Sequence, residues 1–99
     1  MWLLIDDVRD LKADVIARTA QAGWEMLSAH SWDGLLLDHD LGEETTGYDL
    51  LCRALDADVC PKTVILVTSN PVGKAKFMVA ALMHYGYVKG LGEASYYKP

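Results

Sequence analysis

Two groups of acidic residues, each placed where an apolar run stops, are the side chains of this sequence best suited to chemistry. Residues 3–5 are followed by Asp6 and Asp7, and residues 35–37 are followed by Asp38. Short continuous apolar runs are typical of strands buried on both faces of a parallel sheet, and ligands of such sheets bind beyond the carboxyl ends of the strands. We therefore expect both acidic groups to lie at one edge of a sheet.

Carboxylates gathered in this way need a positive charge or a shared proton. Two of them about 4 Å apart repel by roughly 4 kcal/mol at an effective dielectric constant near 20. Magnesium takes oxygen ligands in near-octahedral geometry. Asp6, Asp7 and Asp38 suit Mg²⁺ or Mn²⁺ better than they suit zinc, so we predict a divalent-metal site there. The plain structural alternative is that Asp7 or Asp10 caps a helix and Asp6 is solvated.

Composition limits the classes of protein to be considered. A chain of 99 residues with 52% hydrophobic content is expected to form one domain over residues 1–99. The formal net charge of −5 argues against broad binding of nucleic acid or anionic membranes through a basic face. The two cysteines lie in no CxxC pattern, which argues against a zinc site. With no signal-peptide core and no membrane-length apolar run, we expect a cytoplasmic location.

The second strand has two alternative placements. In the preferred one, residues 14–18 form the strand and Thr19 caps a helix over residues 20–29. In the other, residues 11–22 form a helix and residues 24–27 form the strand.

The remaining elements follow the same alternation of short apolar runs and helical spacing. We expect strands at residues 2–6, 35–38 and 64–67, helices at residues 47–57 and 72–85, and a short edge strand at residues 87–89 or 95–97. Strands that alternate with helices through short links predict a parallel, three-layer α/β domain.

Four motifs along the chain carry a family resemblance: Ile5-Asp6-Asp7, the strand ending in Asp38, Gly47-Tyr48-Asp49-Leu50-Leu51 and Val67-Thr68-Ser69. Together they resemble the receiver domains of two-component response regulators, over nearly the whole chain. The resemblance implies a flavodoxin-like fold, here with truncated helices. It also implies that Asp6, Asp7 and Asp38 hold magnesium, that Asp38 accepts a phosphoryl group, and that Thr68 binds the phosphoryl oxygens.

A narrower branch of that family is more similar still, the receiver-derived group named for predicted cyclic-phosphate processing. Its resemblance lies in Leu37-Asp38-His39-Asp40-Leu41-Gly42 and in Ser69-Asn70-Pro71-Val72-Gly73. The sequence departs from the branch at Thr68, where the branch often has a histidine. The receiver lysine has two candidates, Lys89 and Lys98.

Hydrolysis of a cyclic phosphate or a related phosphodiester is the leading functional hypothesis. The ligand would be a phosphate-containing small molecule or a nucleotide end, and the catalytic residues Asp38, His39 and Asp40. A metal lowers the pKa of a bound water and polarises a phosphoryl oxygen. His39 would serve as general acid or base for a leaving 2′- or 3′-oxygen. The plain alternative for His39 is a surface loop histidine.

Further phosphate contacts are expected from the start of the helix near residue 72 and from two arginines. Ser69 and Asn70 precede unpaired backbone N–H groups that favour an anion, although such residues also simply begin helices well. Arg9 and Arg18 could hold phosphate oxygens in a fork, or could be solvated ion-pair partners.

Two alternatives from other classes remain open. The chain could be a phosphoryl-accepting signalling receiver with Asp38 as acceptor. It could also be a regulatory or inhibitory binding module that has a protein partner and no turnover. The sequence determines neither the substrate nor the oligomeric state.

Overall fold

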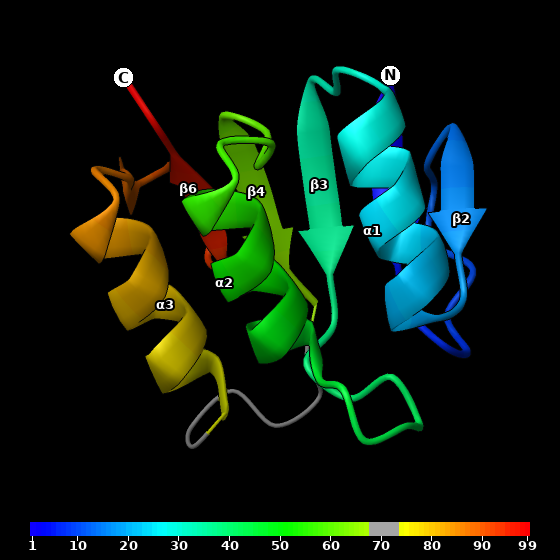
Figure 1. Cartoon of the computed structure of the whole chain (residues 1–99). Coiled ribbons are helices and arrows are strands. Elements are labelled where there is room, and N and C mark those ends of the chain that lie inside the picture. Colours follow the sequence, from blue (N-terminus) through cyan, green and yellow to red (C-terminus); the bar gives the residue numbers. More distant parts are fainter. Residues whose placement is uncertain (68–73) are drawn as a thin grey trace.

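A single mixed sheet with three helices makes up the structure, a computed structural model that describes residues 1–67 and 74–99 (Figure 1). The strands lie in the order β2-β1-β3-β4-β6-β5. The elements along the chain are β1 (Trp2–Ile5), β2 (Val15–Ala17), α1 (Ala20–Ala29), β3 (Gly34–Leu37), α2 (Gly47–Asp56), β4 (Thr63–Leu66), α3 (Lys74–His84), β5 (Val88–Lys89) and β6 (Ser95–Tyr97).

The preferred placement of the second strand is confirmed. Leu4 on β1 is in register with Ile16 on β2, and residues 24–27 lie inside α1. The Thr19 side chain accepts a hydrogen bond from the Ala22 amide at 3.1 Å, which satisfies one of the free N–H groups at the helix start. Gly23 lets α1 pack closely on β1, because a Cβ at this position would lie only 2.8 Å from Ile5 Cδ1.

The sheet is parallel in its centre and antiparallel at one edge. Strands β2, β1, β3 and β4 run parallel, whereas β6 is antiparallel to both β4 and β5. Both segments proposed for the edge strand are therefore strands. They form a hairpin because the connection of residues 90–94 is too short for the crossover that a parallel pair requires.

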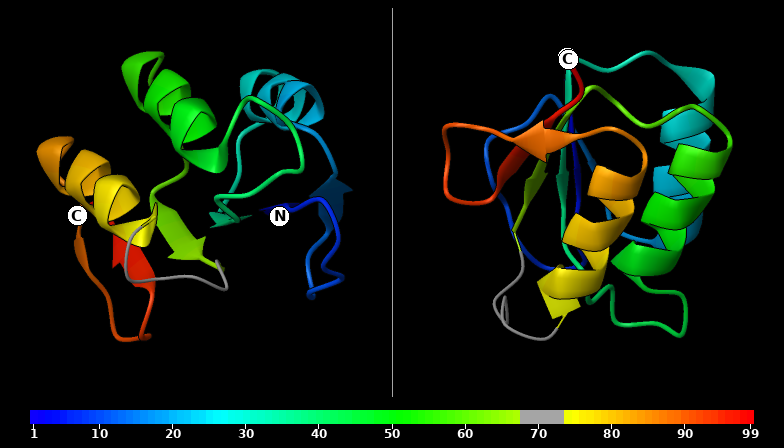
Figure 2. Two further views of the ribbon diagram at one scale, coloured as in Figure 1. Left: turned by 90° about the horizontal axis from the view of Figure 1, so that it is seen from below. Right: turned by 90° about the vertical axis from the view of Figure 1, so that its left-hand side faces the viewer.

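All three helices cover the same face of the sheet (Figure 2). The α/β class and the receiver-like order of the first four strands agree with the prediction, but helices form one layer instead of two. The segment between β1 and β2 forms no helix, and the chain after α3 returns as the β5–β6 hairpin. Within the described ranges, no helix has the length and hydrophobicity that crossing a membrane requires.

The core lies between the sheet and these helices. Leu3, Ile5, Leu35 and Leu37 are fully buried in it. The alternate residues of the strands point to the other face, where Ile16 is 38% exposed. The strand ends that carry the aspartates are thus anchored on one side by dense packing.

Candidate functional site

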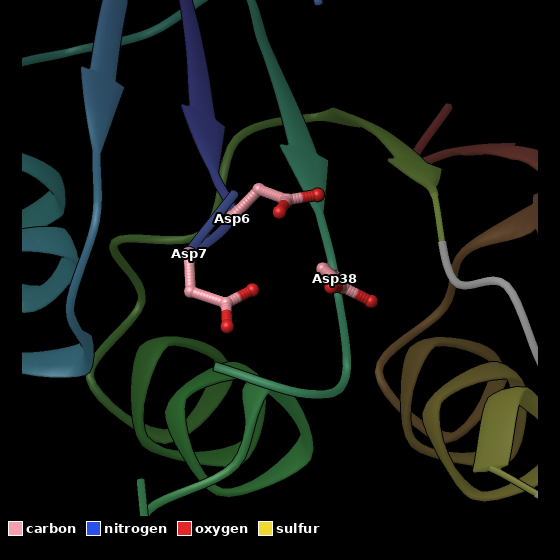
Figure 3. Close-up of side chains that lie close together, drawn as sticks. All are labelled: Asp6, Asp7 and Asp38. Atoms are coloured by element: carbon pink, nitrogen blue, oxygen red, sulfur yellow. The ribbon is translucent and has the colours of Figure 1, made fainter. Parts of the chain in front are cut away.

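Three aspartates meet beyond the carboxyl ends of β1 and β3 (Figure 3). Ile5 and Leu37 are in register on neighbouring strands, so the residues that follow them emerge side by side. One carboxylate oxygen from each of Asp6, Asp7 and Asp38 lies within 4.8 Å of the other two. We call these three residues the acidic cluster. The expectation that separate strand ends deliver their aspartates to one place agrees with this geometry.

Asp6 is fully buried and has a dense set of donors. Its Oδ1 accepts hydrogen bonds from the amides of Val8 and Arg9, both at 3.0 Å, and its Oδ2 accepts one from Arg9 Nη1 at 3.1 Å. Burial alone would raise the pKa of this carboxyl, but these hydrogen bonds outweigh it and hold the pKa below its usual value. Asp6 is therefore ionised and fixed in place.

Asp38 lies in a less favourable electrostatic environment. It is 5% exposed, and its amide donates to the Ile5 carbonyl at 3.0 Å. Burial, together with the negative charge of Asp6, raises the pKa of Asp38 above its ordinary value. Arg9 and the backbone amides of His39 and Asp40 oppose that rise without cancelling it. The cluster thus retains an excess of negative charge at Asp38.

Arg9 places a cationic side chain against the acidic cluster. Its Nη1 is 3.1 Å from Asp6 Oδ2 and 3.4 Å from Asp38 Oδ2, so one guanidinium bridges the two strand ends. Sequence analysis placed Arg9 among the phosphate ligands and did not find this bridge. The signal available was the three-residue spacing from Asp6, which brings a side chain back over the turn that follows the strand.

Arg18 supports the segment that follows β1. Its Nη1 donates to the carbonyl of Arg9 at 2.7 Å and to that of Asp6 at 3.3 Å, and its Nη2 pairs with Asp10. These contacts direct three of the five guanidinium N–H donors to the protein itself. Arg18 positions the turn that carries Asp7 and Arg9, and a direct phosphate contact for it stays a prediction.

Two glycines, Gly42 within the loop of residues 39–46 and Gly47 at the start of α2, allow close approaches around the acidic cluster. A Cβ on Gly47 would lie 1.9 Å from the carbonyl oxygen of Asp38, so only glycine allows the start of α2 to approach the end of β3. Gly42 has φ +69°, and a Cβ there would meet Asp7 Oδ2 at 2.9 Å. The loop therefore lies directly against the acidic cluster.

His39 and Asp40 lie at the start of this loop. His39 is half-buried, and its Nδ1 is 3.4 Å from Oδ1 of the exposed Asp40. This contact can select which ring nitrogen of His39 carries the proton. The pair is thus adjacent to the cluster in the chain, while its catalytic role remains a prediction.

Three predicted phosphate ligands, Thr68, Ser69 and Asn70, lie outside the described residues. Both candidate receiver lysines are described, and they lie elsewhere. Lys89 donates to the carbonyls of Gly90 and Gly92. Lys98 follows β6, whose antiparallel course brings its amide to the Lys62 carbonyl before β4, at the opposite edge of the sheet.

Neither lysine therefore reaches the acidic cluster. Among the side chains of residues 1–67 and 75–99, the ion pairs that involve the cluster are those of Arg9.

Comparison with protein families gives one match. The family model described as the cyclic-phosphate processing receiver domain matches residues 1–83, which include the whole acidic cluster and the parallel strands. No curated protein matches the sequence. The unmatched residues 84–99 hold the β5–β6 hairpin, the part of the sheet that departs from parallel pairing.

Proposed function

The chain belongs to the cyclic-phosphate processing receiver domains, and from this premise we propose that it hydrolyses a cyclic phosphate or a related phosphodiester with the help of a divalent cation. The observation that carries the proposal is the convergence of three carboxylate oxygens within 4.8 Å at the ends of β1 and β3. Parallel α/β sheets bind their ligands at this edge.

The donor set of the acidic cluster fits Mg²⁺ or Mn²⁺. All three side chains offer hard oxygen donors, and ionised carboxylates have lone pairs beyond those used by Val8 and Arg9. The raised pKa of Asp38 has burial and uncompensated negative charge as its causes, which a bound dication would relieve. When bound, such a cation supplies charge neutralisation and a more acidic water.

Arg9 is proposed to bind the phosphate of the ligand. Its guanidinium already lies between Asp6 and Asp38, and a cation held by those carboxylates would take over its role there. The freed guanidinium has a planar set of donors that matches two phosphate oxygens. Arg9 thereby couples occupancy of the metal site to recognition of the anion.

His39 is proposed as the general acid or base for the leaving oxygen. It follows Asp38 directly, is half-buried, and has Asp40 beside its Nδ1, leaving Nε2 for the ligand. Proton transfer by a positioned histidine contributes about 10²- to 10⁴-fold to a rate.

The phosphoryl-receiver alternative has less support from the contacts of the described residues. A phosphorylated Asp38 would need a cationic partner for the transferred group, but the Lys89 ammonium donates to the Gly92 carbonyl, and the backbone of Lys98 lies at the opposite edge of the sheet. Arg9 could meet that charge, but it pairs with the acceptor carboxylate itself. We therefore place hydrolysis first.

A metal titration followed by thermal unfolding tests whether the acidic cluster binds a divalent cation. Mg²⁺ or Mn²⁺ should raise the melting temperature, because a ligand that binds only the folded state stabilises it. Asp7→Asn should abolish the shift, whereas Asp58→Asn, an exposed aspartate with φ 56° that asparagine tolerates, should retain it. Equal shifts in all three proteins would contradict the proposed metal site.

Turnover assays test whether the protein hydrolyses a cyclic phosphate. Cyclic-phosphate nucleotides should be hydrolysed only with the metal present, and His39→Ala should lower the rate by about 10²-fold or more. Incubation with acetyl phosphate and magnesium, followed by intact mass, examines the receiver alternative. A phosphoryl adduct that is absent in Asp38→Asn, with no hydrolysis across the panel, would replace our proposal by that one.

A further inference from the structure

A second feature lies at the same edge of the sheet, a pocket of about 560 Å³ between α3 and the β5–β6 hairpin. Leu66 on β4, Ala75 and Val79 on α3, and Ala94 and Tyr96 on the hairpin form its walls. Its volume falls within the range of roughly 300–1,000 Å³ that small-molecule pockets occupy. The walls are mostly apolar, and Tyr96 contributes an aromatic ring.

The pocket is close to the acidic cluster. Leu66 is in register with Leu37, the residue before Asp38, and the Val67 amide donates to the Leu37 carbonyl at 3.0 Å. The Leu66 amide in turn donates to the Ala94 carbonyl at 3.0 Å. Two strand spacings, about 10 Å, therefore separate β3 from the far wall. Figure 1 shows the first turn of α3 at the same edge of the sheet as the end of β3.

The mouth of the pocket carries one donor and one acceptor of opposite charge. Lys76 comes from the first turn of α3 and Glu93 from the hairpin connection, and both are exposed. Within the described part of the chain, neither of them forms an ion pair. A ligand suited to this pocket is flat, aromatic, and has hydrogen-bond donors and acceptors along its edge.

We propose that this pocket binds the base of a nucleoside cyclic phosphate whose phosphate lies at the acidic cluster. The inference rests on the proposed function and narrows its substrate class to nucleotides. A base has an apolar face that can lie against Tyr96 and the aliphatic walls. Its edge presents amino donors to Glu93 and carbonyl or ring-nitrogen acceptors to Lys76. A cyclic phosphate on a polyol would leave the apolar walls without a partner.

Filling the pocket tests the inference directly. Binding of cyclic guanosine monophosphate and of glycerol cyclic phosphate, which has no base, is measured by calorimetry with Mg²⁺ present, in a His39→Ala background that keeps hydrolysis slow during the titration. Ala75→Leu should weaken nucleotide binding by about tenfold or more, the loss expected when a base contact is removed. It should leave glycerol cyclic phosphate unchanged. Ala80→Leu, the same change at an exposed position of α3, should affect neither ligand.

The opposite results overturn the inference. Equal affinity of the His39→Ala protein for both ligands, no nucleotide binding, or equal weakening of both ligands by Ala75→Leu would each do so. Glu93→Gln provides a second variant at an exposed position that does not burden folding, and it should change the relative affinity for guanosine and adenosine cyclic phosphates. An unchanged ratio would count against an edge contact from Glu93.

Failure of the proposed function is recognised separately. Guanosine without phosphate, titrated in the presence of a chelator, addresses the pocket alone. Guanosine binding that Ala75→Leu weakens, combined with no metal-dependent turnover, would retain the base pocket and remove hydrolysis. Metal-dependent turnover of both ligands at similar rates, without guanosine binding, would retain hydrolysis and remove the base pocket.

Discussion

The two edges of the sheet are held together in different ways. At the amino edge, polar groups have direct partners in the protein: the Met1 ammonium pairs with Asp33, and the Tyr87 hydroxyl donates to the Pro61 carbonyl at 2.6 Å. At the carboxyl edge, the three carboxylates of the acidic cluster lie together, and the guanidinium of Arg9 pairs with two of them, Asp6 and Asp38. The first edge is arranged for stability. The second retains unbalanced charge, which is typical of a site that binds a ligand.

The same contrast appears inside the acidic cluster. Asp6 has two backbone amides and Arg9 as donors, and its pKa is lowered despite burial. Asp38 has a raised pKa because burial and the charge of Asp6 outweigh its own donors. Asp6 is therefore expected to stabilise the fold, whereas ionised Asp38 is expected to cost stability until a cation binds.

The largest expected effect is that of Asp6→Asn. The substitution removes a buried negative charge on which Arg9 and two amides depend, so it should lower the free energy of unfolding by about 2 kcal/mol. Urea unfolding monitored by tryptophan fluorescence measures the change, with Asp58→Asn as the matched control. A loss no greater than that of the control would show that the turn after β1 holds without this carboxylate.

Tyr87→Phe should have the next largest effect, at the amino edge. It leaves the buried Pro61 carbonyl without its hydroxyl donor, which costs about 1.5 kcal/mol. Tyr97→Phe, at a residue 44% exposed, should cost much less. The thermal shift caused by Mg²⁺ should be unchanged in Tyr87→Phe. A reduced shift would contradict this contrast, because it would mean that a contact at the amino edge affects metal binding at the carboxyl edge.

Asp38→Asn should act in the opposite direction from Asp6→Asn. With a chelator present, removal of a charge that burial and Asp6 disfavour should raise the free energy of unfolding by about 1 kcal/mol. With Mg²⁺ present, the melting temperature of the variant should no longer respond. Destabilisation in the chelator would assign Asp38 to the structure instead of to ligand binding.

The smallest effect concerns reactivity rather than stability, and its pH dependence follows from burial. Burial raises the pKa of Cys60 to about 11, so only a small fraction of this thiol is ionised at neutral pH. The variant Cys52→Ser leaves Cys60 as the one cysteine of the chain. In this variant, alkylation of Cys60 by iodoacetamide in the folded protein should accelerate with each pH unit until about pH 11. In urea it should level off near the ordinary thiol pKa of about 8.5. If the alkylation rate of the folded protein also levelled off near pH 8.5, burial would not raise the pKa of Cys60.

Much of the fold could be predicted because the relevant signals are local. The apolar runs of β1, β3 and β4 and the helix caps Thr19 and Thr46 all lie within a few residues of the elements they define, and Thr46 forms a capping box with Asp49. The sequence left two alternatives for the edge strand, because residues 87–89 and 95–97 are short and are held in the sheet by pairing with each other and with β4.

The sequence by itself determined the strand ends on which the aspartates lie, since hydrophobic periodicity and turn residues depend on neighbours in the chain. It also carried the motifs by which the family is recognised. Only the tertiary structure decided that Arg9, which lies three residues after Asp6, also reaches Asp38, that Lys98 lies at the opposite edge, and that all helices cover one face. These features depend on strand order and direction, which join residues far apart in the sequence through contacts that no local pattern encodes.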